Sequence, residues 1–121
     1  MRTSEKAMAA IRSIPENDRP ISEQYRIVAK QWVDAHSAAH ILEETKTATL
    51  SKLMLDLGEM PVSRAEMIVK GSDVWRDHLH KMVEARRQAD MLRVQLKYIE
   101  MRFAEWQASD ATARAEMRMS R

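Results

Sequence analysis

The sequence predicts an all-α fold: a long antiparallel helical hairpin, similar to a coiled coil, preceded by a short N-terminal helix. Three observations favour this fold. The composition is typical of helices, with only 2 Gly and 3 Pro among 121 residues. Apolar residues recur in alternating steps of three and four, which places them on one helix face. A helix stop, Gly58 followed by Pro61, divides the two longest periodic stretches.

The first element is a short helix expected over about residues 4–14. The spacing from Ala7 to Ile14 puts apolar side chains on one face. Pro15 and Pro20 then bracket a polar linker that cannot continue the helix.

The second element is a long helix expected over about residues 22–57. Ser22 is a candidate N-cap, and Gly58 suits the position just after the helix. Lys46 interrupts the apolar face, which Thr49 resumes. The face is formed by Tyr25, Val28, Trp32, Ala35, Ala39 and Leu42.

The third element begins after Pro61. Ser63 and Glu66 have the spacing of a capping box, which predicts a helix over about 63–70. Gly71 either kinks this helix or breaks it, with Ser72 able to cap a new one. The next helix is expected over about 72–108, followed by a fraying C-terminal turn over 110–119. We treat the whole chain as a single helical domain.

The last long helix carries an unbroken apolar seam. Its members are Trp75, His78, Met82, Ala85, Ala89, Leu92, Leu96, Ile99, Phe103 and Trp106.

A turn at 58–61 sets the register of the hairpin. It places Trp32 opposite Ala85 and Ala89, and Tyr25 opposite Leu96, so that large residues face small or complementary ones.

Phe103 and Trp106 extend past the start of the second helix. We expect Ile11 and Ile14 of the N-terminal helix to cover these rings.

A second apolar stripe lies on the same helix, away from the seam. Because a helix with two apolar faces is usually packed on both sides, this stripe predicts a homodimer. It consists of Met91, Val94, Tyr98 and Met101.

Several classes of function find no support in the residues. The chain has no Cys, so thiol chemistry and Cys-based zinc sites are excluded. His36 and His40 share a helix face, but no second ligand motif accompanies them, and we predict no metal. No Gly-rich phosphate loop or nucleophile elbow is found. We expect a non-enzymatic protein with no cofactor and no small-molecule substrate.

The location expected from the sequence is the cytoplasm. No apolar run has the length of a membrane span, and the N-terminus lacks the apolar core of a signal peptide.

Basic residues on the last long helix give the strongest functional signal. Spaced cations of this kind can follow a phosphate backbone, and a tyrosine among them can stack on a base. Interleaved Glu84, Asp90 and Glu100 leave open that the cations serve helix pairing instead. The candidate residues for an anionic partner are Arg86, Arg87, Arg93, Lys97, Tyr98 and Arg102.

Three segments resemble a group of short helical proteins encoded by bacteriophages and prophages, often near DNA recombination genes. The segments are Met82–Asp90, Glu100–Trp106 and Ala111–Met117. The resemblance implies a small phage accessory protein that acts by binding. It brings no catalytic motif.

Three functional hypotheses follow. The first is an accessory protein of DNA recombination or replication that contacts DNA, or a DNA-processing protein, through the basic residues. The second is an inhibitor of a host defence or nuclease complex, similar in role to an anti-CRISPR protein. The third is a structural, self-associating coiled coil.

Overall fold

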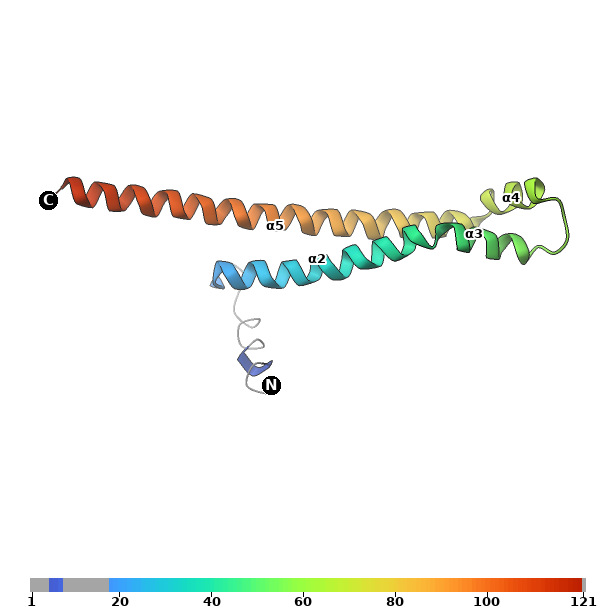
Figure 1. Ribbon diagram of the computed structural model, residues 1–121, viewed down its shortest axis with the longest axis horizontal. Helices are drawn as coiled ribbons and strands as arrows, with labels where there is room; N and C mark the ends of the chain where they lie inside the picture. The colour runs from blue at the N-terminus through green and yellow to red at the C-terminus, as the bar shows by residue number, and fades with distance from the viewer. Residues whose placement is uncertain (1–4, 8–17, 121) are drawn as a thin grey trace. The chain divides into compact units, whose positions relative to one another are not determined.

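A computed structural model describes residues 5–7 and 18–120 of the chain (Figure 1). Every regular element in these residues is a helix, and α2 packs against α5, which confirms the all-α helical hairpin. The elements are α2 (Ile21–Glu44), α3 (Lys46–Leu55), α4 (Val62–Lys70) and α5 (Asp73–Met119). Of the helix predicted over 4–14, only residues 5–7 are described, and they are helical and exposed.

The chain is grouped by its contacts into two compact units. The first combines residues up to Gln31 with those from Leu92 onward, and so holds the start of α2 and the C-terminal part of α5. The second, Trp32–Met91, holds the rest of α2, all of α3 and α4, and the start of α5. That the chain forms one domain stays a prediction.

The prediction of one helix over 22–57 is wrong in two places, because the helix is interrupted at Thr45 and ends at Leu55. Thr45 separates α2 from α3, although the N–H of Thr45 still donates to the carbonyl of Ile41 at 3.0 Å. The Thr45 hydroxyl also donates to the Ile41 carbonyl, at 2.7 Å, and the Thr49 hydroxyl donates to the Thr45 carbonyl at 3.0 Å. Such back-bonding by threonine bends helices, which explains the interruption.

The turn between α3 and α4 uses the predicted glycine. Gly58 adopts a φ of 87°, a left-handed conformation that side chains disfavour, and its N–H donates to the Leu55 carbonyl at 3.1 Å. The turn brings α4 back onto α3.

The predicted capping box of α4 is wrong. The helix begins one residue earlier, at Val62, with Pro61 as the N-cap and no side-chain cap. Glu66 does not reach back to Ser63 but pairs with Lys70 at 2.7 Å. Proline fixes a φ that suits a helix start, so no side-chain cap is needed to begin the helix there.

Gly71 breaks the helix rather than kinking it. It ends α4, and the Ser72 hydroxyl then accepts the N–H of Trp75 at 3.3 Å as the cap of α5. The predicted end near residue 108 is wrong, because α5 is 47 residues long and continues to Met119. An ion pair of 2.7 Å between Arg114 and Asp110, four residues apart, supports this extension.

The apolar seam of α5 is confirmed as the packed face. Its positions from Trp75 to Ile99 are buried or half-buried, and Ala89 is fully covered. On α2, Val28 is buried and Ala39 is also fully covered, as the same spacing predicts. Small residues at these positions let two helices approach closely.

The hairpin register differs from the prediction in the first unit. Tyr25 donates its hydroxyl to Glu100 Oε1 at 3.2 Å, one turn beyond the predicted Leu96. The predicted register was obtained by counting residues from the turn at 58–61. The interruption at Gly71 and Ser72 separates α4 from α5, so that count no longer gives the residues of α5 that lie opposite α2. In the second unit His36, one turn after Trp32, contacts Arg86 beside Ala85.

Candidate functional site

Arg86 is the first of the residues predicted to contact an anionic partner. In the structure its guanidinium contacts side chains within the second unit. Its Nε donates to Glu43 Oε1 at 2.7 Å, and its Nη1 lies 3.1 Å from His36 Nδ1. Since a guanidinium only donates, His36 Nδ1 accepts and the ring proton lies on Nε2. Arg86 therefore links α5 to α2, and a ligand would have to displace both contacts.

The ion pair also changes the acidity of its partners. The hydrogen bond from Arg86 lowers the pKa of Glu43 below its ordinary value of 4.5, and the positive charge of Arg86 adds to the effect. The same hydrogen bond raises the pKa of Arg86. Glu43 is therefore ionised at neutral pH, and the pair is a structural link between the helices.

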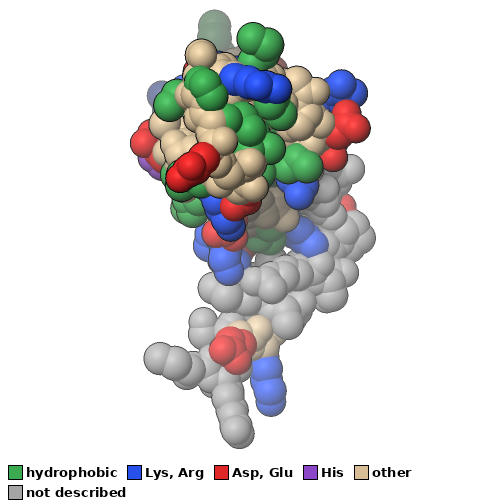
Figure 2. All heavy atoms as spheres, turned by 90° about the vertical axis from the view of Figure 1, so that its right-hand side faces the viewer, with side chains coloured by type: hydrophobic (Ala, Val, Ile, Leu, Met, Phe, Trp, Pro, Cys, Tyr) green, Lys and Arg blue, Asp and Glu red, His purple; other side chains and the backbone are tan. Residues whose placement is uncertain are grey.

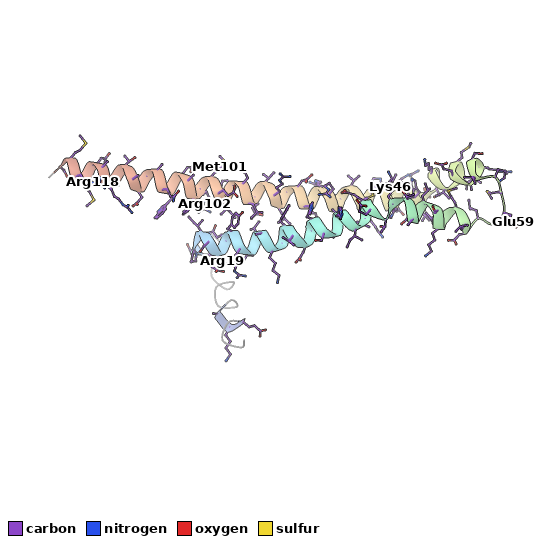
Figure 3. The ribbon with its side chains drawn as sticks, viewed as in Figure 1. Arg19, Lys46, Glu59, Met101, Arg102 and Arg118 are labelled. Carbon is purple, nitrogen blue, oxygen red and sulfur yellow. The ribbon has the colours of Figure 1, made fainter. Side chains whose placement is uncertain are left out.

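Arg102, on α5, is half-buried against the first turns of α2. Its Nη1 donates to Gln24 Oε1 at 3.1 Å, and Gln24 Nε2 donates to the Arg19 carbonyl at 2.7 Å. The Arg102 guanidinium also lies 5.9 Å from the centre of the Tyr98 ring, within cation–π range. Figure 3 shows Arg102 pointing toward α2 and Met101 away from it.

The remaining predicted cations are exposed. Arg87 approaches Glu84 at 3.4 Å along α5. Arg93 and Lys97 make no ion pair or hydrogen bond within the described part of the chain. The first unit therefore contains four of the predicted residues: Arg93, Lys97, Tyr98 and Arg102. Of the three cations among them, Arg102 contacts Gln24 and the Tyr98 ring, whereas Arg93 and Lys97 make no such contact among the described residues.

The predicted second stripe is exposed along α5. In the first unit Val94 is 69 %, Tyr98 59 % and Met101 56 % exposed; in the second unit Met91 is 60 % exposed. Positions 94, 98 and 101 are spaced four and three apart, so they form one continuous face, with the cation of Lys97 beside it. We call Val94, Lys97, Tyr98 and Met101 the outward face.

The C-terminal end of the seam is also exposed. Phe103 is 42 % and Trp106 57 % exposed, and the two rings stack at 6.1 Å. In the first unit α5 continues past the start of α2 (Figure 1). The predicted contacts from Ile11 and Ile14 lie outside the described residues.

A shallow apolar hollow adjoins Phe103. It has a volume of about 370 Å³ and lies where α2 begins against α5. The spacing of apolar residues predicts that α2 and α5 pack along their seams, but it does not predict where α2 begins on α5. The hollow lies at that point, so the sequence does not predict it. The hollow is lined by Ile21, Ser22, Tyr25, Ile99, Glu100 and Phe103.

The other end of the hairpin carries scattered apolar side chains. Leu55, Val62 and Met67 are strongly exposed, and Figure 2 shows hydrophobic side chains mixed with charged ones over this end. A second hollow, of about 290 Å³, lies between α3 and α4 there. Because charges interrupt the apolar surface, this end is a weaker candidate than the outward face.

His36 and His40 take part in a stack of rings on α2. His36 lies between the rings of Trp32 and His40, at 5.0 Å and 6.4 Å. Among the residues described, no group of three or more side chains is arranged to hold a metal ion. No helix in that part of the chain combines the length and apolarity needed to cross a bilayer.

Comparison of the chain with family models, with curated proteins and with solved structures gives no significant match.

Proposed function

We propose that the chain is a non-enzymatic binding protein that takes a helix of another protein on its outward face. The observation that carries this proposal is the exposure of Val94, Tyr98 and Met101 on one side of a helix whose other side is already packed. Covering each such side chain contributes about 1–2 kcal/mol. Apolar faces of this kind, at helical spacing, are typical of helix-to-helix recognition.

Charge indicates the chemistry of the partner. Lys97 belongs to the outward face and Arg93 lies at its edge, and both are exposed. A partner helix with an apolar stripe and acidic residues beside it would match both features. Electrostatic attraction of this kind speeds encounter and sets orientation more than it adds affinity.

The proposal can be tested by comparing two matched variants. Val94 and Val83 are similarly exposed on α5, at 69 % and 64 %, but Val83 lies about 16 Å along the helix from Val94, beyond the outward face. Proteins retained from a bacterial lysate by the wild type should be retained by V83E and lost with V94E. Equal retention by both variants would exclude the outward face as the binding surface.

Direct contact with DNA is the second candidate. It is favoured by the unengaged Arg93 and Lys97 next to Tyr98, whose exposed ring could stack on a base. Two neutralised phosphates give a slope of log K against log salt of only about −1.4 for single strands. Binding would therefore be weak, which is why we place it second.

Salt dependence separates the two candidates. A labelled single-stranded oligonucleotide should bind at low salt, lose affinity with the slope given above, and bind K97E more weakly. Lys81 is also exposed, and K81E is the control with the same charge change. No binding at low salt would remove the DNA candidate and leave the protein partner.

The biological setting remains the one implied by the resemblance to phage-encoded helical proteins. A protein partner would then belong to DNA recombination or replication, or to a host defence or nuclease complex that the chain inhibits. Both roles need only a stable surface that covers part of the partner.

A further inference from the structure

The last part of α5 is a helix without a packing partner among the described residues. Ile21, the first residue of α2, lines the apolar hollow together with Phe103. Beyond Phe103 the side chains up to Met119 are exposed, except for half-buried Asp110. We call residues 104–119 the free segment. At 1.5 Å per residue it is about 24 Å long.

The free segment continues the seam that packs on α2. Counting on in steps of three and four, the seam positions after Phe103 are Trp106, Asp110, Ala113 and Met117. Trp106 is 57 % and Met117 65 % exposed. A lone exposed helix with a large aromatic ring on its seam leaves apolar surface in water that another helix could cover.

We propose that the free segment pairs antiparallel with the free segment of a second copy of this chain. The segment's length favours one register. Two copies overlap over its whole length when Ala104 of one faces Met119 of the other, and each partner helix then ends where α2 begins. A longer overlap would run the second copy into α2.

The same register brings the seam positions face to face. Trp106 lies opposite Met117 of the second copy, a ring–thioether contact that the two-fold symmetry repeats. Asp110 lies opposite Ala113 in the middle. An acidic residue on the seam weakens the pairing, but polar residues at such positions favour a single register.

Charge complementarity supports this arrangement. Arg114 pairs with Asp110 of its own helix at 2.7 Å. In this register Asp110 lies on the seam and Arg114 lies beside it. Arg114 of each copy is then offset by only one residue, about 1.5 Å along the helix axis, from Asp110 of the other. The two-fold axis thus creates a cluster of two carboxylates and two guanidinium groups with alternating charge.

The first test measures association and uses two charge-reversal variants. In sedimentation across a dilution series, the wild type should shift from monomer to dimer with rising concentration. R114E places four carboxylates at the cluster and should weaken association about tenfold. Arg118 is exposed on the side of the helix away from the seam, and R118E should change the association constant by no more than about twofold. A monomer at all concentrations would overturn the proposal.

The second test measures orientation, because the chain has no Cys and single labels can be placed freely. Spin labels at Thr112→Cys should lie close together, because residue 112 is near the two-fold axis. Labels at Ser120→Cys should be separated by roughly 25 Å more along the axis. Equal distances at both positions would mean a parallel pair and would contradict the antiparallel model.

Discussion

Ile99 and Phe103 lie one turn apart on the same seam of α5, yet their surroundings differ. Ile99 is buried, whereas Phe103 is 42 % exposed. The difference lies in α2, which begins at Ile21, a residue that lines the same hollow as Phe103. The periodicity of a helix thus shows which face can pack, while the length of its neighbour decides how much of that face is packed.

The largest expected effect contrasts two tryptophans on α5. Trp75 is buried and Trp106 is exposed. Trp75→Ala should lower the free energy of unfolding by about 3–5 kcal/mol, because it leaves a cavity in the packed seam. Trp106→Ala should change it by less than about 0.5 kcal/mol in the monomer. Chemical denaturation at low protein concentration measures both.

Similar losses of unfolding free energy in Trp75→Ala and Trp106→Ala would contradict the contrast between a packed and an exposed part of α5. They would mean that Trp106 is covered within a single chain. Circular dichroism before denaturation checks that each variant is still helical.

A smaller effect separates the two glycines. Gly58 has a φ of 87°, so Gly58→Ala should destabilise the hairpin by about 1 kcal/mol. Gly71 has a φ of −88°, and an added Cβ would meet the Met67 carbonyl at 3.4 Å, an ordinary contact. Gly71→Ala should therefore be neutral or stabilise by up to about 1 kcal/mol.

Thermal unfolding of both glycine variants gives the sign of each effect. If Gly71→Ala were the more damaging change, the break between α4 and α5 would depend on glycine itself. If it is not, the Ser72 cap of α5 is enough to keep the break without glycine at position 71.

The smallest effect concerns acid. Arg86 lowers the pKa of Glu43, so their ion pair stabilises the fold above about pH 4.5 and is lost as the pH falls through the lowered pKa. Glu43→Gln should remove this part of the pH dependence. The stability of the wild type should then approach that of the variant as the solution is acidified.

Denaturation midpoints from about pH 7 down to pH 3 measure this convergence. Glu59 is exposed and makes no ion pair in the described chain, and Glu59→Gln is the control. Equal profiles for the two Gln variants would show that the Arg86–Glu43 pair does not stabilise the fold.

The helical hairpin and its packed seam could be predicted because periodicity and a glycine turn are local signals. The register could not, since it depends on how Gly71 and Ser72 interrupt the helix. Neither could the role of Arg86. Arg86 and Arg93 are seven residues apart and so have equivalent positions in the heptad pattern. Only the position of Glu43 in the structure shows that Arg86 forms an ion pair and Arg93 does not.

The candidate site was predicted in part. Val94, Tyr98 and Met101 form the exposed face that the spacing indicates. The exposure of Phe103 and Trp106 depends on where α2 begins, which the seam alone does not reveal. The predicted contacts of these rings with Ile11 and Ile14 lie outside the described residues.

Amide hydrogen exchange along α5, resolved by residue, tests the central comparison most directly. At concentrations where the chain is monomeric, protection should be high up to about Arg102 and fall steeply from Ala104 to Met119. Protection that stays uniform to the end of the helix under those conditions would contradict the division of α5 into a packed part and a free segment.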